Sequence, residues 1–224
     1  MTARKKVGIL ISGRGSNMQA LVEAMADTAF PAEPVVVISN RPEAAGLAWA
    51  AARGIPAVAI DHKQFATRPA FEARLHQTLL DHGVEIVCNA GFMRMLTGGF
   101  VDRWRDRQLN IHPSLLPAFP GLDTHRRALD QGVLVSGCTV HFIRTEMDSG
   151  PIIAQAAVAV LPGDTEETLA ARILAAEHQI YPLALRLVAA GHVHVENETA
   201  VFTTGMATPR PLIVPALIGP DRPS

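Results

Sequence analysis

The chain has 224 residues, of which 48% are hydrophobic, and 20 lysines and arginines nearly balance 21 acidic residues to give a net charge of -1. This length suffices to bury the core of one α/β domain. The balanced charge provides no broad basic surface, which argues against a nucleic-acid or anionic membrane partner.

The cysteines and the apolar runs indicate the compartment. Cys88 and Cys138 stand apart inside apolar runs, a pattern typical of reduced thiols rather than of a secreted disulfide framework. No apolar run approaches the roughly 20 residues that a membrane-spanning helix needs. We therefore expect a soluble, cytoplasmic protein.

The first half of the chain alternates short β-branched runs with longer alanine-rich segments. The short runs predict the strands Val7–Ser12, Val35–Ser39, Val58–Ile60, Ile86–Ala90 and Leu109–His112. The longer segments predict the helices Ser16–Asp27, Ala44–Arg53 and Pro69–His82, with Ser16 as the N-cap of the first. This alternation predicts βαβ units and a largely parallel sheet.

After Gly121 the pattern changes. Two longer apolar runs, joined by a connection short enough for an antiparallel pair, predict the strands Ser136–Ile143 and Pro151–Val160. Asp164 with Glu167 three positions later predicts the start of a helix that continues to about Ala189 and is interrupted or bent at Pro182. We expect residues 1–203 to form a single α/β domain with a mostly parallel mixed sheet and helices on both faces. Residues 204–224 are expected to form a proline-rich tail.

The stretch GRGSN, residues 13–17, lies where the first predicted strand turns into the first predicted helix. Unpaired backbone N–H groups and the helix dipole favour an anion there, and glycine lets the anion approach closely. Met18 stands where a dinucleotide fingerprint has its third glycine, and a Walker motif is absent. A plain tight turn is the alternative, but the added donors Ser16 and Asn17 indicate a small phosphate monoester.

Asn110 and His112 end the fifth predicted strand, where ligands bind in open α/β sheets. Two positions apart on a strand, their side chains point to the same side, and Pro113 keeps His112 extended. A structural hydrogen-bonding pair is the alternative. Asp148 lies in a turn where aspartate ordinarily bonds only locally. If its carboxylate approached His112, it would favour the imidazolium and raise the pKa of that histidine.

Six motifs in a fixed order, ISGRGSN, AGFMRML, LNIHPSLLPAFPGLDTH, GCTVHF, MDSGPII and AEHQIYP, closely resemble the phosphoribosylglycinamide formyltransferase family over roughly residues 6–198. The resemblance implies a Rossmann-like fold and a role in de novo purine biosynthesis. The implied reaction transfers the formyl group of the co-substrate 10-formyltetrahydrofolate to the amine of glycinamide ribonucleotide, giving formylglycinamide ribonucleotide and tetrahydrofolate. It further implies that Asn110 bonds the formyl oxygen, that His112 donates the proton, and that Asp148 raises the pKa of His112.

The resemblance also assigns binding residues. It implies that Gly15, Ser16 and Asn17 bind the phosphate and that Glu177 contacts the glycinamide end of the nucleotide. The folate is expected against Asn110 and against the backbone of Met93, Arg94, Met95 and Leu96, with Arg68 as a nearby basic residue. For Glu177 and Arg68, a solvated surface charge is the alternative.

Two positions depart from the family's pattern. Asn89 stands where an apolar residue is usual, and Asp123 stands at a position often held by histidine or another polar residue. A buried Asn89 would need hydrogen-bonding partners, which the edge of the site could supply. No metal is expected, because His192 and His194, which alternate on a short predicted strand, have no third ligand spaced to join them.

Three other functions are compatible with parts of this pattern. Formyltetrahydrofolate deformylase shares the Asn, His and Asp set but normally carries a regulatory domain in front, and only about six residues precede the first strand here. Methionyl-tRNA formyltransferase adds an RNA-contacting barrel and needs basic surface. The third alternative is a non-catalytic folate- or phosphate-binding module. The expected partners are small molecules, and the chain is expected to be a monomer or homodimer.

Overall fold

A seven-stranded sheet forms the centre of the computed structural model, which describes residues 3–203, 205 and 212–214. Its strand order is β3-β2-β1-β4-β5-β6-β7. The parallel strands are β1 (Lys5–Ile11), β2 (Ala32–Ser39), β3 (Ala57–Ala59), β4 (Ile86–Asn89) and β5 (Gln108–His112). The antiparallel strands β6 (Val135–Phe142) and β7 (Ile152–Ala159) extend the β5 edge. The predicted mostly parallel mixed sheet is therefore confirmed.

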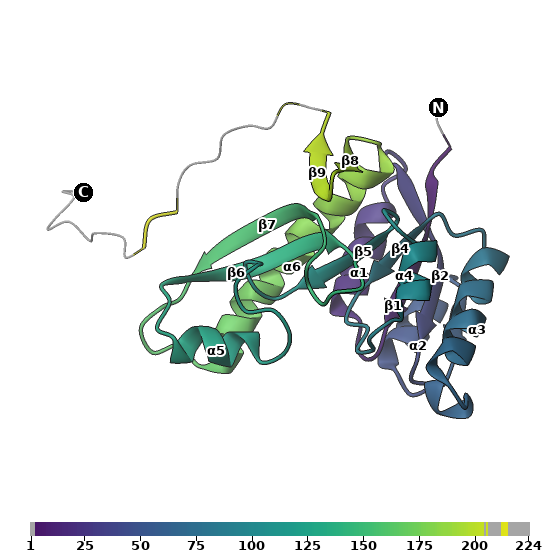
Figure 1. Cartoon of the computed structure of the whole chain (residues 1–224), viewed down its shortest axis with the longest axis horizontal. Coiled ribbons are helices and arrows are strands. Elements are labelled where there is room, and N and C mark those ends of the chain that lie inside the picture. The colour runs from purple at the N-terminus through teal and green to yellow at the C-terminus, as the bar shows by residue number, and fades with distance from the viewer. Residues whose placement is uncertain (1–2, 204, 206–211, 215–224) are drawn as a thin grey trace, which may run out of the picture.

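Helices cover both faces of the sheet, as predicted (Figure 1). One face carries α1 (Ser16–Met25), α2 (Ala45–Ala51), α5 (Thr124–Asp130) and the long α6 (Glu166–Ala189). The other carries α3 (Arg68–Asp81) and α4 (Gly98–Arg103), and a short 3₁₀ turn, η1 (His62–Gln64), precedes α3. A hairpin of β8 (Val193–Glu196) and β9 (Thr199–Phe202) follows α6.

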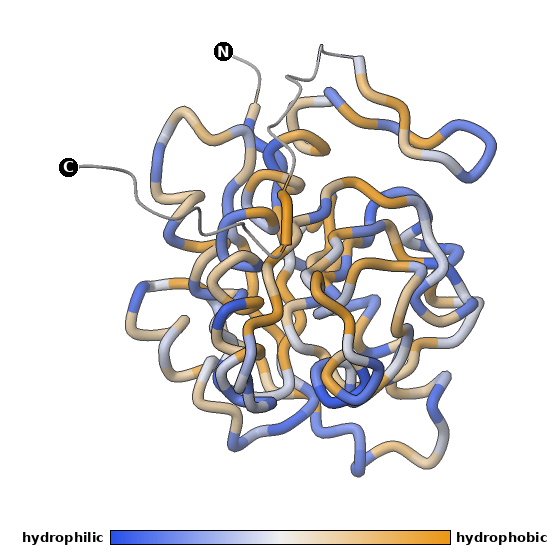
Figure 2. The backbone as a smooth tube through the Cα atoms, turned by 90° about the vertical axis from the view of Figure 1, so that its left-hand side faces the viewer, coloured by the Kyte–Doolittle hydropathy of each residue, from blue (hydrophilic) through white to orange (hydrophobic). Residues whose placement is uncertain are grey.

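Each face of the sheet has its own apolar core. Successive side chains of a strand point to opposite faces, so β1 sends Ile9 and Ile11 into the core under α1 and α6 and Leu10 into the core under α3 and α4. Figure 2 shows apolar segments running through the middle of the molecule and hydrophilic turns around its periphery. Burial on both faces explains why the parallel strands are nearly continuous apolar runs.

The strand order places a topological switch point between β1 and β4. The chain leaves β1 for β2 and β3 on one side and later returns to β4 and β5 on the other. The connections that follow β1 and β4 therefore diverge. Ligands of such sheets bind beyond the carboxyl ends of the strands at this point, so we expect them beside the ends of β1 and β4.

Two helix starts differ from the sequence predictions. Gly15, in the left-handed region at φ 71°, is the N-cap of α1, and Ser16 is the first helical residue without a capping hydrogen bond. Thr165 caps α6 through a reciprocal pair with Thr168, whereas Asp164 pairs with Arg172. The predicted Asp164 start was wrong because a hydroxyl one residue later satisfies the first turn.

The long helix α6 continues through Pro182, so the interruption expected there as one of two outcomes does not occur. The prediction of a tail over residues 204–224 falls mostly outside the described residues, of which only 205 and 212–214 lie in that range. Within the described part of the chain, no helix is both long and apolar enough to cross a bilayer.

Candidate active site

The structure brings His112 and Asp148 together. His112 ends β5, and Asp148, at φ 52°, lies in the connection between β6 and β7. Its Oδ2 is 3.5 Å from Nδ1 of His112, and the two side chains are only 11% and 8% exposed. The backbone N–H of Gly121 donates to the same Oδ2 at 2.8 Å, which holds the carboxylate in place.

The other ring nitrogen of His112 also faces an oxygen. Its Nε2 is 3.0 Å from the backbone carbonyl of Phe119, in the segment that follows the strand. Each nitrogen of this buried imidazole therefore has an acceptor next to it. Oxygen atoms on both sides of the ring are what a cationic imidazole needs.

Asn110 lies on the same face of β5 and pairs with a second histidine, His141, across the β5–β6 ladder. Nδ2 of Asn110 is 3.2 Å from Nε2 of His141, whose Nδ1 is 2.9 Å from the Phe142 carbonyl. The same Nε2 is 3.9 Å from Oδ1 of Asp148. Sequence reasoning missed His141, although its motif GCTVHF was part of the resemblance, because the register of β6 against β5 cannot be obtained from residue patterns.

The environment of His141 keeps its ring neutral. Burial lowers the pKa of His141, against the opposing effects of the Phe142 carbonyl and the Asp148 carboxylate. A neutral ring that donates from Nδ1 to Phe142 has only an acceptor at Nε2. It therefore accepts from one N–H of Asn110 and leaves the second N–H of that amide for another acceptor.

The turn at residues 13–17 follows β1 and leads into α1. Gly15 adopts a left-handed conformation, and a Cβ built there would lie 2.9 Å from the Met18 side chain. The left-handed backbone favours glycine here, whereas the Met18 contact involves only the flexible end of that side chain. Asn17 is the second residue of α1, and its Nδ2 donates to Oε2 of Glu177 on α6 at 2.6 Å.

Glu177 is buried, so its alternative as a solvated surface charge was wrong. Burial raises the pKa of Glu177, and the hydrogen bond from Asn17 opposes that effect. A carboxylate retained at such a position needs polar partners. Oδ1 of Asn17 has no hydrogen-bond partner among the described residues, so this buried pair still offers unused polar atoms to a ligand at the turn.

Residues Met93 to Leu96 lie in the connection between β4 and α4. The buried side chains of Ser12 and Glu72 bind the two ends of this segment. The N–H of Met93 donates to the hydroxyl of Ser12 at 2.8 Å. Beyond the segment, the N–H of Thr97 donates to Glu72 at 2.8 Å, and the Thr97 hydroxyl donates to the same carboxylate. The side chain of Met93 itself is 63% exposed. The segment thus presents backbone and apolar side chains on a fixed support.

The two basic residues expected near the folate lie on adjoining elements. Arg68 is the exposed first residue of α3. The guanidinium of Arg94 lies 5.8 Å from the ring centroid of Phe71, which is one turn along α3 from Arg68. Nε of Arg94 is buried without a hydrogen-bond partner among the described residues. Arg94 thus lies near the first turn of α3, which Arg68 begins.

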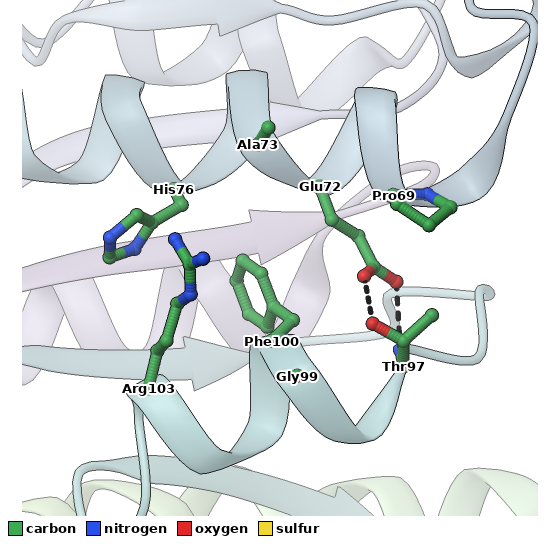
Figure 3. Close-up of a pocket in the computed structure, with 8 residues that line it drawn as sticks. All are labelled: Pro69, Glu72, Ala73, His76, Thr97, Gly99, Phe100 and Arg103. Carbon is green, nitrogen blue, oxygen red and sulfur yellow. Dashed lines mark hydrogen bonds between the residues drawn. The ribbon is translucent and has the colours of Figure 1, made fainter.

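A cavity of about 130 Å³ lies between α3 and α4 (Figure 3). Its lining includes Glu72, His76, Thr97, Phe100 and Arg103. Figure 3 shows the Glu72 carboxylate turned toward Thr97, with His76 and Arg103 at the other end of the cavity. None of Asn110, His112 and Asp148 lines this cavity, so it is separate from those three side chains.

No group of three or more histidine, cysteine or acidic side chains in the described residues could hold a metal ion. The two thiols are also poor ligands. Both cysteines are buried and free, and burial raises the pKa of Cys88 and of Cys138 to about 12. They are protonated at neutral pH and belong to the packing.

Comparisons with known proteins identify relatives over nearly the whole described chain. A family model described as formyl transferase matches residues 5–185. Phosphoribosylglycinamide formyltransferase of Escherichia coli (strain K12) is 40% identical over 201 residues, which cover 90% of this chain and 94% of that protein. The crystal structure of glycinamide ribonucleotide transformylase 1 from Symbiobacterium toebii has a TM-score of 0.87 at 47% identity, covering 90% of this chain and 95% of that one.

Two further relatives differ in length or in activity. The trifunctional purine biosynthetic protein adenosine-3 of Bos taurus is 49% identical over 90% of this chain, but the chain spans only 20% of the length of that relative. A formyltetrahydrofolate deformylase from Burkholderia mallei is 28% identical, with a TM-score of 0.81, and the match covers 71% of it. The fold is thus shared by transferases and by a deformylase.

Proposed function

The chain belongs to the formyl transferase family, and from that premise we propose that it transfers the formyl group of 10-formyltetrahydrofolate to the primary amine of glycinamide ribonucleotide. The products are formylglycinamide ribonucleotide and tetrahydrofolate, in de novo purine biosynthesis. The observation that carries the proposal is the convergence of Asn110, His112 and Asp148 from a strand and a distant loop. The proposal is also supported by the relative from Escherichia coli, a phosphoribosylglycinamide formyltransferase that the chain matches over 94% of its length.

The chemistry assigns one role to each of these residues. The amine attacks the formyl carbon, a C–N bond forms, and negative charge develops on the formyl oxygen. The free N–H of Asn110 donates to that oxygen and stabilises it. The bond from the formyl carbon to N10 of the folate then breaks, and His112 supplies the proton that N10 takes up. The attacking nitrogen releases a proton, which balances the transfer, and Asp148 stabilises the protonated ring.

The two substrates would occupy opposite sides of this cluster. Gly15, Ser16 and Asn17 at the start of α1 would bind the phosphate, with Glu177 contacting the glycinamide end of the nucleotide. The folate would lie against the 93–96 segment, mainly on its backbone, with Arg68 near its anionic tail. We propose that the enzyme works without a metal, in the cytoplasm, as a monomer or homodimer.

Hydrolysis of the same formyl donor is the second candidate, because water could replace the amine at this cluster. The buried Asn17–Glu177 pair at the anion-binding turn favours the transferase. A hydrolase that releases formate has no nucleotide to bind, so it has no use for a phosphate cradle next to its catalytic residues.

The test is to incubate purified protein with 10-formyltetrahydrofolate, with and without glycinamide ribonucleotide, and to follow tetrahydrofolate by absorbance and formate by a coupled assay. We expect product only with the nucleotide and no release of formate. We also expect His112→Ala to abolish turnover while both ligands still bind. Formate release without the nucleotide would identify a deformylase, and normal folate binding without turnover would identify a non-catalytic module.

A further inference from the structure

A second polar pair, Asn89 and Gln108, lies beside the catalytic amide. Nε2 of Gln108 donates to Oδ1 of Asn89 at 3.0 Å, and the two side chains are 1% and 5% exposed, respectively. Oε1 of Gln108 is buried and has no hydrogen-bond partner among the described residues. If the two amides were reversed, the bond between them would survive and would still leave one polar atom of Gln108 unused. Leaving a buried amide oxygen without a donor is unfavourable by itself.

The pair lies on the same face of the sheet as Asn110. Asn89 is the partner of Asn110 in the β4–β5 ladder, so their side chains are neighbours about 4.8 Å apart across the strands. Gln108 precedes Asn110 by two positions on β5, about 6.6 Å along the same face. The remaining neighbours of Asn110 on this face are His112 and His141, which the reaction already uses.

The connectivity of the co-substrate determines what lies beside the pair. In 10-formyltetrahydrofolate a single methylene joins N10 to the pterin ring. With the formyl group at Asn110, the ring must lie within a few ångströms of that residue. The 93–96 segment lies in the connection from β4 to α4 and begins four positions after Asn89, the last residue of β4. The edge of a reduced pterin carries several N–H donors, which complement an unused amide oxygen.

From this geometry we propose that Gln108 is a specificity residue for the folate, whose Oε1 accepts a hydrogen bond from an N–H of the pterin ring while Asn89 orients the amide. The inference rests on the proposed function, since it places the formyl group at Asn110. A ligand contact would explain why two amides are buried beside Asn110, next to the apolar core under α3 and α4. Apolar side chains at these positions would pack there without unpaired polar atoms.

The test compares Gln108→Met with the double variant Asn89→Leu/Gln108→Met. Each removes the acceptor with little change in volume, but only the double variant leaves no unpaired amide. Dissociation constants for 10-formyltetrahydrofolate are measured by calorimetry, together with KM for each substrate and the thermal midpoint. We expect both variants to bind the folate about five- to tenfold more weakly, as the loss of one hydrogen bond predicts. The KM for glycinamide ribonucleotide should stay unchanged in both variants.

A purely structural pair gives a different pattern. Folate affinity would fall in Gln108→Met and return to the wild-type value in the double variant, and that result would overturn the proposal, as would unchanged affinity in both. Should Gln108→Met fail to fold, the double variant decides alone. Calorimetry needs no turnover, so a wild-type protein that binds folate but transfers no formyl group would refute the proposed function while the Gln108 comparison still gives its own answer.

Discussion

The proposed catalytic cluster (Asn110, His112, Asp148 and His141) and the proposed phosphate turn (residues 13–17) are held in place by different parts of the chain. Asn110 and His141 are fixed by the ladder between β5 and β6, but Asp148 reaches the cluster from a connection and is anchored by the N–H of Gly121 in another. The turn at Gly15 is supported only by regular elements, because it begins α1 and packs against α6 through Glu177. In the proposed function, chemistry would thus depend on two loops meeting, whereas nucleotide binding would depend on a preformed helix start.

The largest expected effect comes from breaking the meeting of the two loops. In Asp148→Asn the side chain keeps its shape and can still accept from Gly121, but it loses the negative charge that lies 3.5 Å from Nδ1 of His112 and that the proposed mechanism uses. We expect kcat to fall on the order of 100-fold or more, with little change in KM for either substrate. Steady-state kinetics measures this. A variant that lost substrate affinity instead would place Asp148 in binding.

The proposed phosphate turn is tested by Gly15→Ala with Gly54→Ala, after α2, as its control. Alanine at either position must adopt a left-handed backbone, at roughly 1–2 kcal/mol. A Cβ at position 15 also approaches the flexible end of the Met18 side chain, whereas at Gly54 it meets nothing within 4 Å. We expect both variants to lower the thermal midpoint, but only Gly15→Ala to raise KM for glycinamide ribonucleotide, about tenfold. An equal rise of KM at both positions would argue against a preformed cradle.

Glu177→Gln should separate stability from binding. The raised pKa of Glu177 means that folding opposes its ionisation, so its destabilising effect is absent below about pH 4.5 and grows as pH rises through the folded pKa. At pH 7.5 we expect a higher thermal midpoint, by about 2–4 °C if the free energy of unfolding rises by about 1 kcal/mol. We also expect a higher KM for the nucleotide. Glu23→Gln, at an exposed position on α1, is the control. A midpoint that falls at pH 7.5 would show that the charge is needed for folding.

The smallest expected effect concerns His141 and acid. Its lowered pKa means that the unfolded chain binds a proton below about pH 6.5 that the folded chain refuses, so stability is lost as pH falls through that range. We expect His141→Gln to flatten the fall of the thermal midpoint between pH 7 and pH 5, with a remaining slope from other histidines such as His76, whose burial also lowers its pKa. An unchanged slope would mean that His141 is protonated in the folded protein.

The sequence predicted the parts of this molecule that depend on local pattern. The βαβ rhythm gave the sheet and both helical faces, and two positions on one strand sufficed to place Asn110 and His112 on the same side. The register of β6 against β5 and the approach of the Asp148 loop to His112 have no such local signal in the sequence. His141 was missed for that reason, and the approach of Asp148 to His112 could be stated only through a resemblance. The short helices α4 and α5 lack the several turns that make apolar periodicity visible.

Burial was the other quantity that residue patterns did not supply. Glu177 could be read as a solvated charge on a helix face, and only the packing of α1 on α6 shows it bonded to Asn17. Asn89 was recognised as an amide in need of partners, but the partner, Gln108, became clear only from the β4–β5 ladder.

A double-mutant cycle on kcat between His112→Ala and Asp148→Asn tests the central claim most directly, namely that the carboxylate acts through the imidazole. If the two groups work as one unit, the double variant should be no slower than His112→Ala alone, since the carboxylate has nothing left to stabilise once the ring is gone. Losses that multiply in the double variant would show that Asp148 acts on the reaction independently and would contradict the assigned mechanism.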